Sequence, residues 1–205
     1  MSLGNAHTRT KGPVKRIPEN AGKLVMIDQQ IAWYVLRVTY QRELAAKEAM
    51  ERFGVEAYVP ERLVRRRDSH GRFSTFREAA IHNYLFVRTS KLVIDDLKTF
   101  RLPMLRYVMH VVDGVRCPMT VPEMQMRHFI AITGNREARI LYLSPLEPEL
   151  MKGDRVRITG GPLEGVEGKF VRIRNTKERC VVVTIEGIAA VATADVSPAL
   201  VEKIP

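Results

Sequence analysis

The chain has 205 residues, enough for one or two domains, and 45% of them are hydrophobic, so a packed core is expected rather than wholesale disorder. Lys and Arg total 33 against 23 Asp and Glu, and the resulting net charge of +10 favours contact with a polyanion without identifying it. No apolar run reaches the roughly 18 residues of a membrane helix, and two cysteines are too few for a disulfide framework or a cysteine-based zinc site. We therefore expect no membrane partner and a reduced, cytoplasmic setting.

The first predicted elements follow a segment without periodicity. Residues 1–30 mix Gly, Pro, Asn and Lys, which predicts a flexible N-terminal tail. Residues 31–38 (IAWYVLRV) are rich in β-branched and aromatic side chains and predict a strand. Apolar residues at helical spacing in QRELAAKEAMERFG then predict an amphipathic helix that ends at Gly54.

A basic hairpin is predicted next. The segments VEAYVPERLVRRR and RFSTFREAAIHNYLFVRTS predict two strand regions around the turn-rich residues 68–71. Six arginines crowd this hairpin: Arg62, Arg65, Arg66, Arg67, Arg72 and Arg77. A solvated, charged arm is the usual explanation for such a run. The alternative is an electrostatic nucleic-acid surface on which Phe73, Phe76 and His70 stack against unpaired bases.

The second half of the chain begins with mixed elements and ends with strands alone. SKLVIDDLKTF predicts a short helix, RYVMHVV a strand, and Asp113-Gly114 a tight turn. Thr120 followed by Glu123 is a capping-box pattern, which predicts a helix through VPEMQMRHFIAI. Residues 135–151 predict a linker, and residues 152–205 contain only short strand patterns. The predicted fold class is therefore α+β followed by a small all-β barrel.

The glycine-rich run GDRVRITGGPLEGVEGKFVRIRN does not fit the patterns of phosphate-binding loops. A Walker loop requires Ser or Thr after its lysine, but Lys169 is followed by Phe170. A dinucleotide-binding fingerprint requires a helix after the glycines, whereas KFVRIRN has a strand pattern. The glycines are therefore interpreted as turns and bends of a barrel, in which the apolar residues of RVRI face one way and its arginines the other.

The sequence proposes no catalytic chemistry. The five histidines have no metal-ligand spacing, and Cys117, which precedes a proline, is interpreted as a packed small hydrophobe. We therefore expect neither an enzyme nor a metal or other cofactor.

The segment IHNYLFV is apolar on both faces of a strand. Tyr84 and Phe86 share one face, and Leu85 and Val87 share the other. Two interpretations stay open at this point. The strand is either central and covered by helices on both sides, or one face is left open as an aromatic groove for a partner helix.

The order of these segments resembles a known family. WYVLRV, a helix, AYVP, the basic hairpin, NYLFV and then GDRVRITGGPLEGVEGKF are similar to the NusG family of transcription elongation factors. The resemblance implies a NusG N-terminal domain at residues 31–134, in which helices flank an antiparallel sheet, and an SH3-like KOW barrel at residues 152–205. Within the family, NYLFV is more similar to the specialised paralogues of the RfaH and UpxY types than to the housekeeping factor.

The resemblance also implies a function. The N-terminal domain of the family binds the clamp helices of the largest RNA polymerase subunit and suppresses pausing or termination, in this case on a specialised operon such as one for capsular polysaccharide. The depression that binds the clamp helices is implied to comprise Ile81, Tyr84, Phe86, Met126 and Phe129. Non-template DNA or nascent RNA, and a ribosomal protein or termination factor for the KOW domain, are further implied partners.

Some positions depart from the family pattern. Ile81-His82 replaces the usual aromatic-Pro pair, and Asp95-Asp96-Leu97-Lys98 replaces a His-Thr-rich segment with which RfaH touches the opposite jaw of the polymerase. The positions through which RfaH contacts its DNA element are not basic here. We expect a different nucleic-acid surface instead, made of Arg37, Arg42, Lys47, Arg65, Arg66, Arg67 and Arg72.

Two further hypotheses follow from the resemblance. RfaH holds its domains together by a Glu–Arg pair whose approximate counterparts are Glu78 and Arg179, and such a pair would let the KOW domain cover the Tyr84 groove. The segment CVVVTI strongly favours strand, which argues against a helical alternative for that domain.

The competing function is a ribosome-associated, RNA-binding KOW protein, because ribosomal proteins share the motif.

Overall fold

The computed structural model describes residues 29–67, 70–135, 139–143, 153–172, 179–185, 187–193 and 196–205. The predicted N-terminal tail therefore lies almost entirely outside the described residues. The first part of the fold is an antiparallel sheet with strand order β2-β5-β1-β6, and β9 also pairs with β1. The strands are β1 (Ile31–Arg37), β2 (Glu56–Tyr58), β5 (Tyr84–Ser90), β6 (Arg106–Tyr107) and β9 (Thr120–Val121).

Strands β1 and β5 form the centre of this sheet. Val35 lies opposite Phe86, and Leu36 lies opposite Leu85. Because successive side chains alternate between faces, Val35 and Phe86 pack towards helix α4 (Glu123–Gly134) on one side. Leu36 and Leu85 pack towards helices α2 (Glu43–Arg52) and α3 (Lys91–Phe100) on the other. Strand β5 is therefore central and buried on both faces, which is the first of the two interpretations of IHNYLFV.

The three helices lie where the sequence predicts them. Gly54 follows α2 with φ +73°, a left-handed conformation that glycine adopts without strain, as its predicted capping role requires. The Ser90 hydroxyl accepts a hydrogen bond from the Val93 amide and caps α3. The predicted capping box of α4 is wrong, because Thr120 pairs with β1 inside strand β9 and Pro122 occupies the N-cap position.

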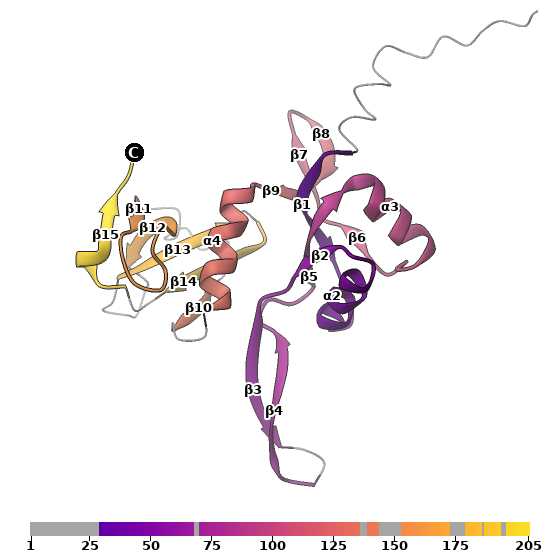
Figure 1. Ribbon diagram of the computed structural model, residues 1–205, viewed down its shortest axis with the longest axis horizontal. Coiled ribbons are helices and arrows are strands. Elements are labelled where there is room, and N and C mark those ends of the chain that lie inside the picture. Colours follow the sequence, from indigo (N-terminus) through magenta and orange to yellow (C-terminus); the bar gives the residue numbers. More distant parts are fainter. Residues whose placement is uncertain are drawn as a thin grey trace, which may run out of the picture.

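The basic hairpin is a separate two-stranded arm, formed by β3 (Glu61–Arg67) and β4 (Phe73–Ala79), and it projects away from the sheet (Figure 1). Each strand region that the sequence predicts around residues 68–71 is in fact two strands. The first breaks at Pro60, which has no amide hydrogen to donate to a sheet. The second breaks before β5, where Asn83 has φ 70°.

A second hairpin joins β7 (Met109–Val112) to β8 (Val115–Pro118). Asp113 and Gly114 both have positive φ, 50° and 77°, as a tight type I′ hairpin turn requires. The turn that the sequence predicts is therefore present.

The C-terminal strands form one six-stranded antiparallel sheet of order β10-β14-β13-β12-β11-β15, which is called the barrel below after its predicted class. Its elements are β10 (Ile140–Leu143), β11 (Asp154–Ile158), β12 (Glu167–Arg172), β13 (Arg179–Ile185), β14 (Ala189–Thr193), the 3-10 helix η2 (Pro198–Leu200) and β15 (Val201–Lys203). In β11, Val156 and Ile158 are buried whereas Arg155 and Arg157 are exposed, as the alternation predicts. Strand β10 falls inside the predicted linker, so residues 140–143 belong to the barrel sheet through their pairing with β14.

Helix α4 lies between the sheet and the barrel (Figure 1). One continuous hydrophobic cluster joins Phe86 of the sheet, Phe129 of α4 and Val183 of β13. The order of layers is therefore α2 and α3, the sheet, α4, and the barrel. No helix among the described residues has the length and apolar character that crossing a membrane requires.

Candidate functional site

The five residues of the expected depression come together in the structure. Phe86, Met126 and Phe129 are completely buried in one hydrophobic cluster, and Ile81 and Tyr84 are half-buried against it. The ring centroids of Phe86 and Phe129 are 5.4 Å apart with the planes tilted by 55°, a favourable aromatic geometry. The arrangement is a filled aromatic seam with two accessible side chains at its edge, rather than an open groove.

A partly buried hydrogen bond fixes α4 to strand β2. The hydroxyl oxygens of Tyr58 and Thr133 are 2.6 Å apart. Because the Thr133 hydroxyl donates its hydrogen to the Phe129 carbonyl at 2.7 Å, Tyr58 must be the donor to Thr133. Burial raises the pKa of Tyr58 to about 12, because the charged phenolate would lose its hydration. No sequence pattern indicates the pair, because its members are 75 residues apart.

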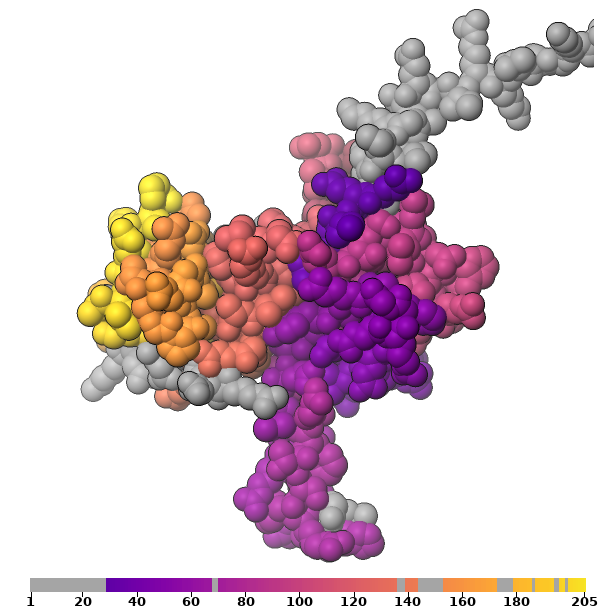
Figure 2. All heavy atoms as spheres, in the orientation of Figure 1, coloured from indigo at the N-terminus to yellow at the C-terminus, as the bar shows by residue number. Residues whose placement is uncertain are grey.

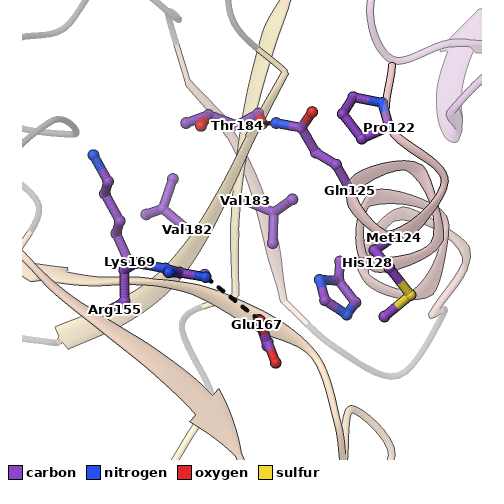
Figure 3. Close-up of a pocket in the computed structure, with 11 residues that line it drawn as sticks. Pro122, Met124, Gln125, His128, Arg155, Glu167, Lys169, Val182, Val183 and Thr184 are labelled. Atoms are coloured by element: carbon purple, nitrogen blue, oxygen red, sulfur yellow. Dashed lines mark hydrogen bonds and ion pairs between the residues drawn. The ribbon is translucent and has the colours of Figure 1, made fainter. Parts of the chain in front are cut away.

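The barrel covers the outer side of α4. The Gln125 side-chain amide on α4 donates a hydrogen bond to the backbone carbonyl of Thr184 on β13. Beside this contact lies a cavity of about 350 Å³ between α4 and strands β11, β12 and β13. Figure 3 shows Gln125 and His128 reaching from the helix towards Glu167 and Thr184 on the barrel strands. The barrel therefore covers the side of α4 that faces away from the first sheet, next to the aromatic seam.

His128 is a titratable group in this junction. Burial lowers the pKa of its imidazole, the Glu167 carboxylate opposes that effect, and the charges of Arg127 and Arg157 reinforce it. A hydrogen bond from the Arg157 guanidinium to Glu167, 3.0 Å from Nε to Oε1, lowers the pKa of Glu167. The neutral imidazole is therefore the form that fits the packed junction. The sequence does not single out Gln125 or His128, and their i, i+3 spacing on a helix is the signal that could have linked them.

Two glutamates of the arm engage three of its arginines. Glu78 accepts hydrogen bonds from Arg62, at 2.8 Å, and from Arg66. Glu61 is bound by Arg77 and, at 3.1 Å, by Lys47 of α2. Burial acts to raise the pKa of Glu61, but the hydrogen bonds from Arg77 and Lys47 outweigh it and the net pKa is lowered. These pairs hold the two strands of the arm together and join the arm to α2.

Arg65 and Arg67, which lie on the other face of β3, have a different partner. The guanidinium carbons of Arg65 and Arg67 lie 4.5 and 5.2 Å from the centroid of the Phe73 ring. Both arginines and the phenyl ring are exposed. The guanidinium groups therefore rest on an aromatic platform in contact with solvent.

The other predicted basic residues are distributed over the domain. Arg37 is exposed at the end of β1, and Arg42 is exposed at the N-cap of α2. A cavity of about 380 Å³ between the start of α2 and the base of the arm is lined by Gln41, Arg66 and His82, among others. The structure therefore brings the start of α2 close to the base of the arm, and Lys47 is held in its ion pair with Glu61.

The expected interdomain pair has other partners in this structure. Glu78 lies opposite Arg62 in the register of the arm and binds Arg62 and Arg66, while the Arg179 guanidinium lies 5.7 Å from the Phe170 ring centroid inside the barrel. The contact between barrel and α4 is made instead by Gln125 and by the shared hydrophobic cluster. Within the described ranges, no group of three or more His, Cys, Asp or Glu side chains is placed to hold a metal ion.

Comparisons with known proteins point to one family. Residues 31–130 match the sequence model of the NusG family, described as transcription termination factor nusG. No curated protein sequence matches the chain. Among solved structures, a Thermotoga maritima NusG, reported for its domain interaction, is 25% identical and aligns over 86% of this chain and 98% of its own, with a TM-score of 0.43. The family match covers residues 31–130, slightly less than half of the chain, and makes this segment similar to a domain of a family of transcription factors.

Proposed function

We propose that the chain is a transcription elongation or antitermination factor that binds the clamp helices of RNA polymerase through the aromatic seam of its NusG-family domain. The observation that carries the proposal is the joining of Ile81, Tyr84, Phe86, Met126 and Phe129 in one apolar cluster at α4 and β5. Two of these side chains are partly accessible, and an amphipathic helix docks on such a surface through a few apolar anchors. Binding that favours the closed clamp shifts its population and reduces pausing without covalent chemistry.

The barrel is the regulatory element of this proposal. Gln125 and the apolar cluster fasten β13 against α4, so polymerase access requires the barrel to move away. Because the C-terminal segments form strands while docked, covering the site needs no helical form of this domain. The released barrel is then free to bind a ribosomal protein or a termination factor.

The specialised role rests on the resemblance of NYLFV to the RfaH and UpxY paralogues. It predicts action on one operon, such as one for capsular polysaccharide, rather than on all transcripts. Deletion of the gene is expected to lower the promoter-distal transcripts of that operon and leave most other transcripts unchanged. A loss of distal reads across all long operons would instead indicate a housekeeping factor.

The direct test is a pull-down of purified RNA polymerase. Tyr84→Ala and Ile81→Ala are expected to weaken binding by about tenfold or more while leaving the fold intact, since both side chains are only half-buried. Phe86→Ala is a poor probe because removing a fully buried phenylalanine destabilises a domain by about 3–5 kcal/mol. Phe100→Ala is the matched control, because that ring is 71% exposed at the end of α3 on the opposite side of the sheet.

The same experiment distinguishes the proposed polymerase-binding function from the competing ribosome-associated function. Polymerase binding that survives both edge substitutions would reject the seam as the docking surface. Failure to bind polymerase together with co-sedimentation on ribosomes would instead favour a ribosome-associated KOW protein.

A further inference from the structure

The six arginines of the arm do not have equal roles, and the difference can be traced to their partners. Among the described residues, the ion pairs within the arm use Arg62 and Arg66 with Glu78, and Arg77 with Glu61. Two carboxylates, Glu61 and Glu78, lie beside these three arginines, so the charge of the three is partly offset. The three arginines contribute less to the field that an incoming polyanion meets than they would without those carboxylates.

Strand register places two further arginines, Arg65 and Arg67, on one face of the arm near its tip. Arg67 lies opposite Phe73 and Arg65 opposite Thr75, so both arginines are on the same face as the phenyl ring. As neighbours at i and i+2, their Cα atoms are about 7 Å apart along the strand. Leu63, further down this face, is 68% exposed, so the face is both apolar and cationic.

The aromatic platform leaves the arginines available for a ligand. A guanidinium that rests on a ring uses its flat face, whereas its N–H donors lie in its plane and point outward. Phosphate oxygens accept hydrogen bonds from that planar edge, often two at a time. Phe73 is itself 56% exposed and offers a surface on which an unpaired base can stack.

The arm also lies away from the contact between barrel and α4. Figure 2 shows it extending from the body of the molecule on a side that the barrel does not cover. A ligand can therefore reach the tip whether or not the barrel is docked. Access to the aromatic seam at α4, in contrast, depends on the position of the barrel.

From these observations we propose that Arg65, Arg67 and Phe73 form a sequence-independent binding site for a nucleic-acid backbone, while Arg62, Arg66 and Arg77 serve to hold the arm rigid. Phosphates bind the two guanidinium edges and an unpaired base stacks at Phe73. The shared chemistry is a phosphodiester chain, from DNA or from RNA. This site extends the proposed function in transcription, but it acts without polymerase and while the barrel is docked.

The test measures binding of the full chain, without polymerase, to three fluorescent probes: oligo(dT), oligo(rU) and a duplex of arbitrary sequence. The double variant Arg65→Gln/Arg67→Gln is expected to bind on the order of tenfold more weakly at low salt. The slope of log affinity against log salt should become shallower by about 1.4 on single strands, or about 1.8 on duplex. Phe73→Leu, which keeps apolar bulk but removes the ring, is expected to weaken single-strand binding by about fivefold or more.

Two controls keep the result specific. Arg52→Gln/Arg101→Gln removes the same charge from exposed positions beside α2 and α3 and is expected to leave affinity and slope nearly unchanged. Thermal melting of each variant should match that of the unaltered chain, which shows that the arm still folds. The relative affinities of the three probes identify DNA or RNA as the natural source.

The proposal is overturned if the Arg65/Arg67 double variant keeps the affinity and salt slope of the unaltered chain, or if the charge-matched control loses as much. It is also overturned if none of the three probes binds, in which case the charged tip suits an acidic protein surface. None of these results bears on polymerase binding, because Tyr84 and Ile81 are unaltered in every variant.

Discussion

Gln125 on α4 donates a hydrogen bond from its side-chain amide to the backbone carbonyl of Thr184 on β13. This contact joins a helix of the segment that matches the NusG family to a strand of the barrel, 59 residues further along the chain. It lies beside the apolar cluster that contains Phe129, so the two domains are joined at the face proposed to meet polymerase. Several measurable consequences depend on this junction and on the contacts around it.

Holding the junction closed is expected to prevent polymerase binding. In a Cys117→Ser background, Gln125→Cys and Thr184→Cys are joined by a short bis-maleimide, which links α4 to β13. The linked protein should lose most of its polymerase binding in a pull-down, whereas either single-cysteine variant treated with the same reagent should bind normally. Equal binding by the linked and unlinked proteins would show that the barrel does not cover the site. Retention of oligo(dT) binding by the linked protein would agree with an arm that works independently.

Lowering the pH is expected to loosen the junction through His128. Burial lowers the pKa of His128 in the packed state, so the imidazole binds a proton more readily once the barrel has moved away. Docking is therefore strongest above the ordinary histidine pKa of about 6.5 and weakens as the pH falls through that value towards the lowered one. In the Cys117→Ser background, energy transfer between dyes at Arg101→Cys and Glu164→Cys should fall from pH 7.5 to pH 5.5. His128→Gln should remove most of the change, and an unaltered pH response in that variant would exclude His128 as its source.

Raising the pH is expected to weaken the fold through Tyr58. Its folded pKa of about 12 exceeds the ordinary value of 10, so the protonated phenol contributes stability that is complete below pH 10 and is lost as the pH rises towards 12. The two-unit difference corresponds to about 2 to 3 kcal/mol in the free energy of unfolding. Urea unfolding at pH 8 and pH 11 should show a larger loss for the unaltered chain than for Tyr58→Phe. A loss of equal size in both would mean that other groups cause the alkaline effect.

The hydrogen bond of Tyr58 can be measured separately at neutral pH. Tyr58→Phe is expected to destabilise the chain by about 1 kcal/mol, and Thr133→Val by about 1–3 kcal/mol because it leaves the buried tyrosine donor without an acceptor. In a double-mutant cycle the two effects should not be additive, since both remove the same bond. Additive effects would show that the two hydroxyls do not interact in solution.

The barrel should be intolerant of a side chain at Gly168. A Cβ atom there would lie 2.6 Å from the Val182 carbonyl oxygen, so strands β12 and β13 would have to separate. Gly168→Ala is expected to destabilise the barrel by about 1–3 kcal/mol, measured as a lower urea midpoint. Gly134→Ala is the matched control because nothing lies within 4 Å of its added Cβ, and it should be neutral or slightly stabilising. Comparable losses in the two variants would contradict the close strand approach.

Local patterns were sufficient to predict most of the helices and strands. The period of Ala46, Met50 and their neighbours predicts α2, and the alternation in β11 predicts which of its side chains are buried, because both signals depend only on residues close in the chain. Boundaries were less well predicted where neighbouring chain segments compete. Thr120 is a residue type that favours a helix cap, but its backbone pairs with β1 in a strand ladder. Strand β10 was not recognised inside the predicted linker because its partner β14 lies about 50 residues away.

The sequence by itself determined most of the strands, the α-helices, the apolar character of both faces of β5 and the concentration of arginines on one hairpin. Only the tertiary structure decided which of those arginines lie beside carboxylates, because Glu61 and Glu78 reach them through strand register rather than chain proximity. It also decided that the aromatic seam is filled and that the barrel rests on α4. The physical reason is the same in each case: hydrophobic burial and ion pairing depend on distance in space, and local periodicity carries no information about segments that meet across the fold.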